Sequence, residues 1–255
     1  MLISPSRADC IIFGVDNVLT DSTAACSSAV SRCIAACAPE LLGYDADNVD
    51  AFPFYKEALS YSLFYDDVAW ALLSAMSSSG CTDAQNALPS MAKWKDMLGA
   101  AGRLGIETLG VSSVARDKVA RLCRQIYTGE NGRGTAELEK PLFKKKWSKI
   151  SMPVAVCTPR TRQETEAALS VIEWQDLPSS RIVCSDSYGK KGAIDSLCSK
   201  LGCRWPLYLG ALPGDREFAS TYSRGDFITI GTTIPSSAIR FSSAADALRA
   251  ILGVF

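Results

Sequence analysis

Residues 10–22 read CIIFGVDNVLTDS, an apolar run over 10–15 followed directly by a polar segment. Later in the chain, further short apolar runs occur over 153–157 (PVAVC), 181–184 (RIVC), 206–209 (PLYL) and 227–230 (FITI). These runs contain many Val and Ile residues and are bounded by Asp, Thr, Ser or Gly. Such segments are typical of strands that are buried on both faces of a parallel sheet.

Helical patterns alternate with these runs. They cover residues 161–172, 191–201, 215–222 and 244–252. Strands that alternate with helices favour an α/β fold in which a doubly wound parallel sheet is built through right-handed crossovers. We therefore predict this fold class for the residues that carry the five apolar runs.

About 130 residues of a different character separate the first apolar run from the second. Segments 22–38, 61–76, 85–101 and 113–127 have apolar residues at helical spacing, and the GENGRG stretch at 129–134 is typical of a loop. We expect an all-helical cap, residues 22–134, inserted after the first strand. The α/β core is then formed by residues 1–21 and 135–255.

The composition excludes several classes of site. The 255 residues have a formal net charge of zero, and no apolar run is long enough to span a bilayer, so we expect a cytoplasmic protein that binds neither nucleic acid nor membrane. The chain has no histidine, which excludes Ser-His-Asp and Cys-His catalysis and histidine-ligated metals. Its ten cysteines are too sparse for a disulfide scaffold, and we expect them to be core residues rather than metal ligands.

Polar residues follow the ends of the predicted strands. In an open parallel sheet, ligands bind beyond the carboxyl ends of the strands. The segments at this edge are 16–22 (DNVLTDS), 158–160 (TPR), 185–191 (SDSYGKK) and 210–215 (GALPGD). Their loop amides and a lysine have the chemistry to hold a phosphate group.

At this edge the chain resembles the haloacid dehalogenase superfamily. The run IIFGVDNVLTDS is similar to the first motif of that family, Asp-x-Asp-Gly-(Thr/Val)-Leu-x-Asp-Ser after a hydrophobic strand. The resemblance continues in order through Thr158, a lysine at Lys190 or Lys191, and the loop at 210–215. It implies a phosphatase-like member with a helical cap after the first strand, and CTPRTRQE is similar to the second motif of phosphatase-like members.

Two positions depart from the family pattern. The resemblance places the nucleophilic, magnesium-binding aspartate at Gly14 and a second magnesium-binding aspartate at Ala211. Neither side chain can attack phosphorus or ligate a metal ion. We therefore expect degenerate catalytic motifs, no phosphoaspartyl chemistry and no metal cofactor.

The resemblance assigns roles to the remaining residues. Asp16 is at the acid/base position, and Asp215 and Arg160 are placed behind the residues that contact the ligand. The resemblance implies that phosphate is contacted by Asn17, Thr158, Pro159 and Lys190, with Lys191 as the alternative lysine.

Each of these residues also has a purely structural interpretation. Asp16 can bond its own turn, Thr158 can be the N-cap of the following helix, and Asp215 can be an N-terminal helix acid. Arg160 either reads an anionic ligand group or faces solvent, and either lysine can be a plain surface residue.

The leading hypothesis is a phosphatase homologue, catalytically impaired or inactive, that binds phosphate or a small phosphate ester between core and cap. Losing two carboxylates while keeping a lysine lowers the repulsion that a phosphate dianion meets, even without magnesium. The alternatives are a hydrolase with an atypical mechanism that lacks the aspartyl nucleophile, and a purely structural or interaction role. The ligand's identity and the oligomeric state stay open.

Overall fold

The computed structural model describes residues 7–42, 113–129, 134–231 and 239–253. The chain divides into two compact units, residues 1–22 with 139–255 and residues 23–138. The second unit contains helices α1 (Thr23–Leu42) and α7 (Ser113–Thr128) and the 3-10 turn η3 (Thr135–Leu138). The expected helices at 61–76 and 85–101 lie outside the described residues. No described helix has the length and apolar character needed to cross a membrane.

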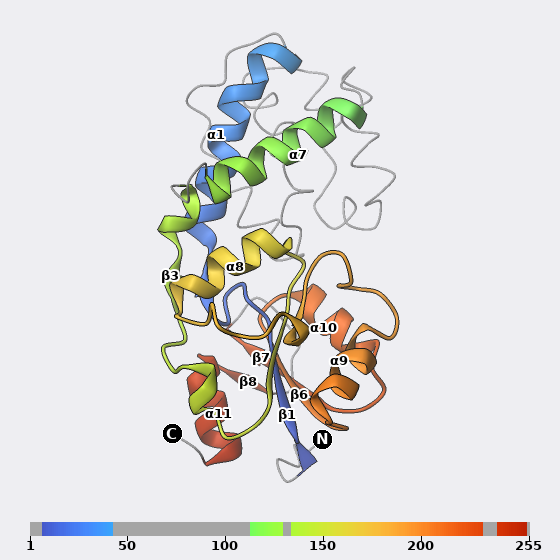
Figure 1. Cartoon of the computed structure of the whole chain (residues 1–255). Helices are drawn as coiled ribbons and strands as arrows, with labels where there is room; N and C mark the ends of the chain where they lie inside the picture. Colours follow the sequence, from blue (N-terminus) through green and yellow to red (C-terminus); the bar gives the residue numbers. More distant parts are fainter. Residues whose placement is uncertain (1–6, 43–112, 130–133, 232–238, 254–255) are drawn as a thin grey trace. The chain divides into compact units, whose positions relative to one another are not determined.

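The first unit is the α/β unit (Figure 1). Its strands are β1 (Cys10–Phe13), β2 (Thr20–Asp21), β3 (Lys140–Pro141), β4 (Val154–Cys157), β5 (Ile182–Val183), β6 (Pro206–Gly210), β7 (Asp226–Ile230) and β8 (Arg240–Phe241). Its helices are α8 (Arg162–Val171), α9 (Ala193–Leu201), α10 (Pro213–Ser220) and α11 (Ala244–Leu252), with 3-10 turns η4 (Trp147–Lys149) and η5 (Ser179–Arg181).

The main sheet is parallel throughout, with strand order β5-β4-β1-β6-β7-β8. The chain runs outward from β1 through β4 to β5, and then returns to place β6 on the other side of β1. The predicted doubly wound parallel sheet is confirmed. The order reverses beside β1, and a reversal of this kind opens a crevice at the carboxyl ends of the strands.

Side chains of β1 alternate between two buried faces of the sheet. Ile11 and Phe13 belong to a core cluster that includes residues of α8 and α11, whereas Cys10 and Ile12 belong to one that includes residues of α9 and α10. All four β1 residues are fully buried. Because successive strand residues point to opposite faces, a strand covered on both faces reads as one continuous apolar run.

A separate two-stranded sheet lies outside the main one. In it β2 pairs with β3 in antiparallel register, Thr20 opposite Pro141 and Asp21 opposite Lys140. The apolar patterns did not predict this pair, because each strand has only two residues.

Candidate functional site

The polar residues expected at the carboxyl edge of the sheet are largely buried. Asp16 follows β1, Thr158 and Arg160 follow β4, and Asp215 lies in the first turn of α10 after β6. Asp16 and Asp215 are each 3% exposed, and Thr158 and Arg160 are fully buried. These polar groups therefore depend on partners within the protein.

Arg160 joins two carboxylates in a buried ion cluster. Its Nη2 donates to Oδ1 of Asp16 at 2.7 Å and its Nε to Oδ2 at 3.3 Å. Its Nη1 donates to Oε1 of Glu139 at 2.7 Å. The hydroxyl of Ser22 adds a bond of 2.6 Å to Oδ1 of Asp16. Arg160, Asp16 and Glu139 form one buried group with a formal charge of −1, which we call the Arg160 cluster.

The turn after β4 fixes the backbone of Arg160. Its N–H donates to the hydroxyl of Thr158 at 3.3 Å, and its carbonyl accepts from the N–H of Ser185 at 2.8 Å. The side chain is directed into the protein, so the solvent-facing interpretation of Arg160 is wrong. The sequence contained no signal for this outcome, because its partner Glu139 is distant in the chain.

The N-cap of α8 is Thr161 rather than Thr158. The hydroxyl of Thr161 accepts from the N–H of Glu164 at 3.4 Å, and the Glu164 carboxylate accepts from the N–H of Thr161 at 2.7 Å. This reciprocal pair is a capping box. The N-cap interpretation of Thr158 is therefore wrong, and its hydroxyl supports Arg160 instead.

Glu139 is a site residue that the sequence analysis missed. It lies immediately before β3, and β3 pairs with β2, which lies within the polar segment after β1. The pairing brings Glu139 to the edge of the sheet from a part of the chain that follows no predicted strand. Only the unpredicted β2–β3 pair could have indicated it.

Asp215 has quite different partners. Its Oδ2 accepts from the N–H groups of Ala211 and Leu212 at 3.0 and 3.1 Å, and its Oδ1 accepts from the hydroxyls of Tyr188 and Tyr208 at 3.2 and 3.4 Å. Burial raises its pKa to about 7, although the two backbone bonds act in the opposite direction. The helix-acid interpretation of Asp215 is confirmed, since it holds the N–H groups that precede α10.

Asp215 also lies against the two glycines at this edge. A Cβ atom at Gly14 would lie 3.1 Å from Oδ2 of Asp215. A Cβ atom at Gly210 would lie 2.6 Å from Cβ of Asp215 and 2.7 Å from Cε2 of Phe227. Asp215 therefore borders the space into which an aspartate at position 14 would extend.

The residues assigned to phosphate contact are more dispersed. Lys190 and Lys191 are both exposed, and Pro159 is partly exposed. Asn17 is partly exposed with a φ of 60°, and its N–H donates to the carbonyl of Thr20 at 2.8 Å. The structure thus places Asp16, Thr158 and Arg160 in one buried group and leaves both lysines toward solvent.

The carboxylates of this edge do not fit a Mg²⁺ ion. Mg²⁺ requires near-octahedral oxygen ligands, usually including one or two carboxylates. Both oxygens of Asp16 accept bonds from the Arg160 guanidinium, and both oxygens of Asp215 accept from amides or tyrosines. A cation already occupies the space beside Asp16, and Gly14 and Ala211 supply no replacement ligand.

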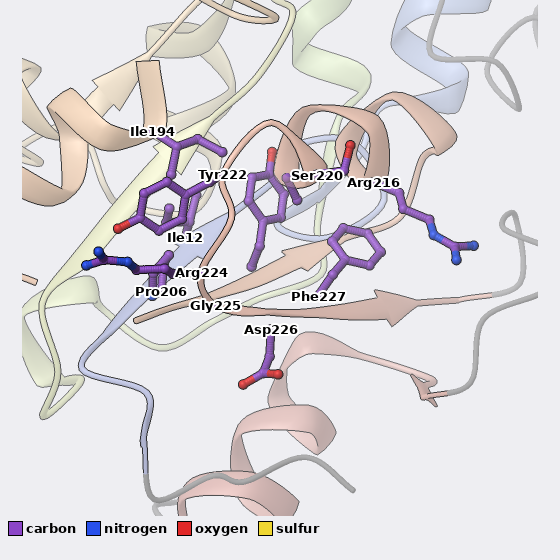
Figure 2. Close-up of a pocket in the computed structure, with 12 residues that line it drawn as sticks. Ile12, Ile194, Pro206, Arg216, Ser220, Tyr222, Arg224, Gly225, Asp226 and Phe227 are labelled. Carbon is purple, nitrogen blue, oxygen red and sulfur yellow. The ribbon is translucent and has the colours of Figure 1, made fainter. Parts of the chain in front are cut away.

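A cavity of about 220 Å³ lies at the opposite end of the strands (Figure 2). Its lining includes Pro206 and Asp226, the first residues of β6 and β7, together with Ile12, Ile194 and Tyr222. Because these strand residues are at the amino ends, the cavity is distinct from the carboxyl edge. The sequence motifs gave no indication of it.

Comparisons with known proteins agree with the topology. No protein-family model and no curated protein matches the sequence. Among solved structures, phosphatase Tt82 from Thermococcus thioreducens has a TM-score of 0.64 at 17% identity, covering 96% of this chain and 99% of that one. A predicted phosphoglycolate phosphatase from Haemophilus somnus has a TM-score of 0.62 at 14% identity, covering 95% and 97%.

A third solved structure is described as a hydrolase of the HAD superfamily, subfamily IA, from Geobacter sulfurreducens. It has a TM-score of 0.53 at 14% identity and covers 96% of both chains. Identities this low establish the fold and leave the activity open. With its parallel sheet, switch point beside β1 and these structural neighbours, the chain has the fold of the haloacid dehalogenase superfamily.

Proposed function

We propose that this chain is a non-catalytic protein with a phosphatase fold that forms no phosphoaspartyl intermediate, and that it binds phosphate or a small phosphate ester through the loop after β5 that carries Lys190. The observation that carries the first half is the Arg160 cluster. Asp16, the acid/base residue by resemblance, accepts three hydrogen bonds from Arg160 and Ser22. A carboxylate held in this way is poorly placed to exchange a proton with a substrate.

The position of the missing nucleophile supports the same proposal. Gly14 has no attacking atom, and Asp215 borders the space that an aspartate there would need. Restoring Asp at position 14 would bring two carboxylates close together, which favours protonation of one of them. The carboxylate of Asp215 therefore has to shift in the variant that combines Gly14→Asp with Ala211→Asp.

The binding half is supported by the N-terminus of α9. Its N-cap is Gly192, which supplies no side-chain hydrogen bond to the first turn. Lys190 and Lys191 are exposed directly before it. The helix dipole favours an anion at such a terminus, and an adjacent ammonium group adds to the attraction. We therefore propose that the phosphate binds at the loop after β5 and not beside the buried carboxylates.

Two measurements on the full chain test the two halves separately. Isothermal titration in EDTA with inorganic phosphate is expected to give heat that is lost in Lys190→Ala and kept in Lys149→Ala, a variant of the lysine in η4. Absence of heat at millimolar phosphate would reject the binding half. Phosphate release from a panel of esters with Mg²⁺ present would reject the non-catalytic half, provided that Asp16→Asn abolishes it.

A second candidate is a hydrolase that uses Asp215 as a general base. The observation in its favour is the pKa of Asp215, which burial raises to about 7, because a base works best when its pKa lies near the working pH. Such an enzyme would lose turnover in Asp215→Asn, and its rate would rise through pH 7. Turnover that is unchanged in Asp215→Asn would exclude this mechanism.

A further inference from the structure

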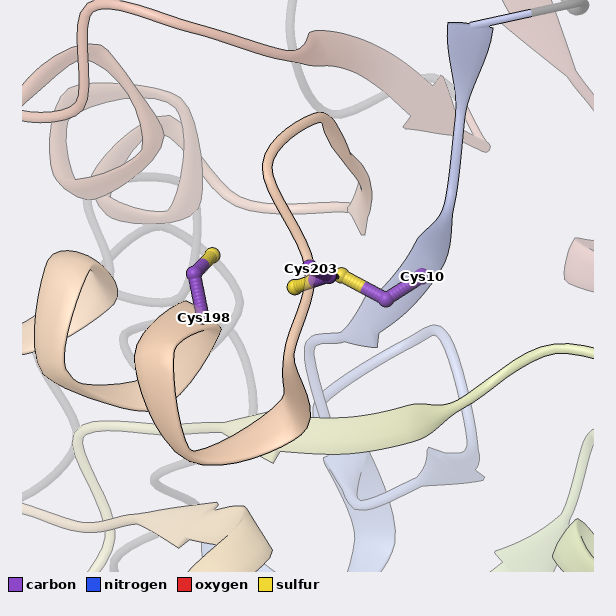
Figure 3. Close-up of side chains that lie close together, drawn as sticks. All are labelled: Cys10, Cys198 and Cys203. Atoms are coloured by element: carbon purple, nitrogen blue, oxygen red, sulfur yellow. Dashed lines mark hydrogen bonds between the residues drawn. The ribbon is translucent and has the colours of Figure 1, made fainter.

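Three cysteines converge at the amino end of the main sheet, away from the carboxyl edge (Figure 3). Cys10 is the first residue of β1, Cys198 lies in α9, and Cys203 lies in the connection from α9 to β6. Their sulfur atoms all lie within 4.8 Å of one another. The Sγ atoms of Cys10 and Cys203 are 2.7 Å apart.

We propose that Cys10, Cys198 and Cys203 form a binding site for one thiophilic metal ion, Zn²⁺ or Cu⁺. The proposal is independent of the phosphate site and departs from the expectation that these cysteines serve only as core. Soft thiolate ligands select such ions over Mg²⁺ or Ca²⁺.

The spacing of the sulfur atoms is close to what such an ion requires. With Zn–S bonds of about 2.3 Å, two thiolates on one ion stand roughly 3.8–4.0 Å apart. All three sulfur pairs lie below the 4.8 Å limit, so the adjustment is small. Cys10 and Cys203 need to separate by roughly 1 Å, which small side-chain rotations can supply.

The three segments hold the cluster in place. Cys10 and Cys198 belong to the core cluster on the α9 and α10 face, and Cys203 belongs to it as well. The three side chains are 0%, 2% and 7% exposed. The nearby Asp9 carboxylate already accepts the N–H groups of Arg204 and Trp205 at 2.7 and 2.8 Å. We therefore assign three sulfur ligands, with any further position on the ion left to a water molecule or an external ligand.

The lining of the 220 Å³ cavity includes residues that neighbour the cluster. Ile12, Ile194 and Tyr222 line it. Ile12 is two residues from Cys10 on β1, and Ile194 is four residues from Cys198 on α9, so each cysteine shares a face with a lining residue.

The test is metal uptake by the reduced full-length protein, titrated with Zn²⁺ against a chromophoric chelator and with Cu⁺ in a parallel anaerobic series. Wild type is expected to bind one equivalent more than Cys198→Ala. Cys184→Ala is the matched control, since Cys184 and Cys198 are both free and 2% exposed. Cys184→Ala is expected to bind as many metal equivalents as wild type. This result would show that removing a cysteine outside the cluster does not lower metal uptake.

X-ray absorption of the metal-loaded wild type keeps the proposal testable if a variant fails to fold. We expect three sulfur neighbours at about 2.3 Å for zinc. Equal uptake by wild type and Cys198→Ala would overturn the proposal. So would a Cys10–Cys203 disulfide in the isolated protein whose reduction adds no metal-binding capacity, because the pair would then be a structural crosslink.

Discussion

Asp16 and Asp215 have the same exposure, 3%, and lie at the same edge of the same sheet, yet their surroundings differ in kind. Asp16 faces the guanidinium of Arg160, whereas Asp215 faces two backbone amides and two tyrosine hydroxyls. The positive charge of Arg160 offsets the desolvation cost of burying the Asp16 carboxylate. Only neutral donors oppose the burial of Asp215, and its pKa rises to about 7. At equal burial, Asp16 is therefore part of a structural ion pair, whereas Asp215 is a group that titrates near neutral pH.

The largest effect should come from removing the cation. We expect Arg160→Met to lower the free energy of unfolding by about 3–5 kcal/mol, because it leaves two buried carboxylates without a positive partner. Urea denaturation at pH 7 measures the loss. The triple variant Arg160→Met, Asp16→Asn, Glu139→Gln should recover part of it. A change below about 1 kcal/mol in the single variant would mean that the cluster is not buried in solution.

A smaller effect, with a defined pH window, should come from Asp215→Asn. The folded pKa of about 7 exceeds the ordinary value of 3.8, so between these values the folded state holds a proton that the unfolded state has lost. The unfolding free energy of wild type should therefore fall as the pH rises from about 4 to 7, by up to about 4 kcal/mol, and level off above pH 7.

The amide of the Asp215→Asn variant does not titrate, so the difference in stability between wild type and variant should change across this window. Urea midpoints at pH 5 and pH 8 measure it, with Asp195→Asn, which alters an exposed first-turn acid of α9, as the control. Parallel pH profiles for wild type and Asp215→Asn would contradict the raised pKa.

The smallest effect should come from Gly14→Ala, which probes the space beside Asp215. The added methyl group lies 3.1 Å from Oδ2 of Asp215, so that carboxylate must shift by a few tenths of an ångström. We expect a loss of about 1–2 kcal/mol in thermal or urea unfolding. The same substitution should cost less in an Asp215→Ala background, and strict additivity of the two changes would show that the residues are not in contact.

The parts of the fold that the sequence predicted are those with a dense apolar pattern. The runs at 10–15, 153–157 and 206–209 correspond to β1, β4 and β6, because strands covered on both faces need no polar alternation. Strand β8 was missed, since Arg240 and Phe241 form only two ladder positions beside β7. Short edge pairings depend on neighbouring strands rather than on their own sequence.

The candidate site was predictable only in part, for a similar reason. Strand ends placed Asp16, Thr158 and Asp215 at one edge, since parallel strands share their carboxyl end. They could not indicate that Arg160 is directed inward, because that depends on Glu139, 21 residues earlier in the chain. Nor could they indicate the cysteine cluster, whose members are separated in the sequence by up to 193 residues.

The small β2–β3 pair has an evolutionary consequence. It holds the outgoing chain at Thr20–Asp21 beside the returning chain at Lys140–Pro141, about 5 Å apart across an antiparallel ladder. A short connection can bridge such a gap, so the segment between these strands is an insertion whose two ends are adjacent. Insertions whose ends lie close together are well tolerated. Recombination can therefore exchange that segment for one of another length at two adjacent points of the chain.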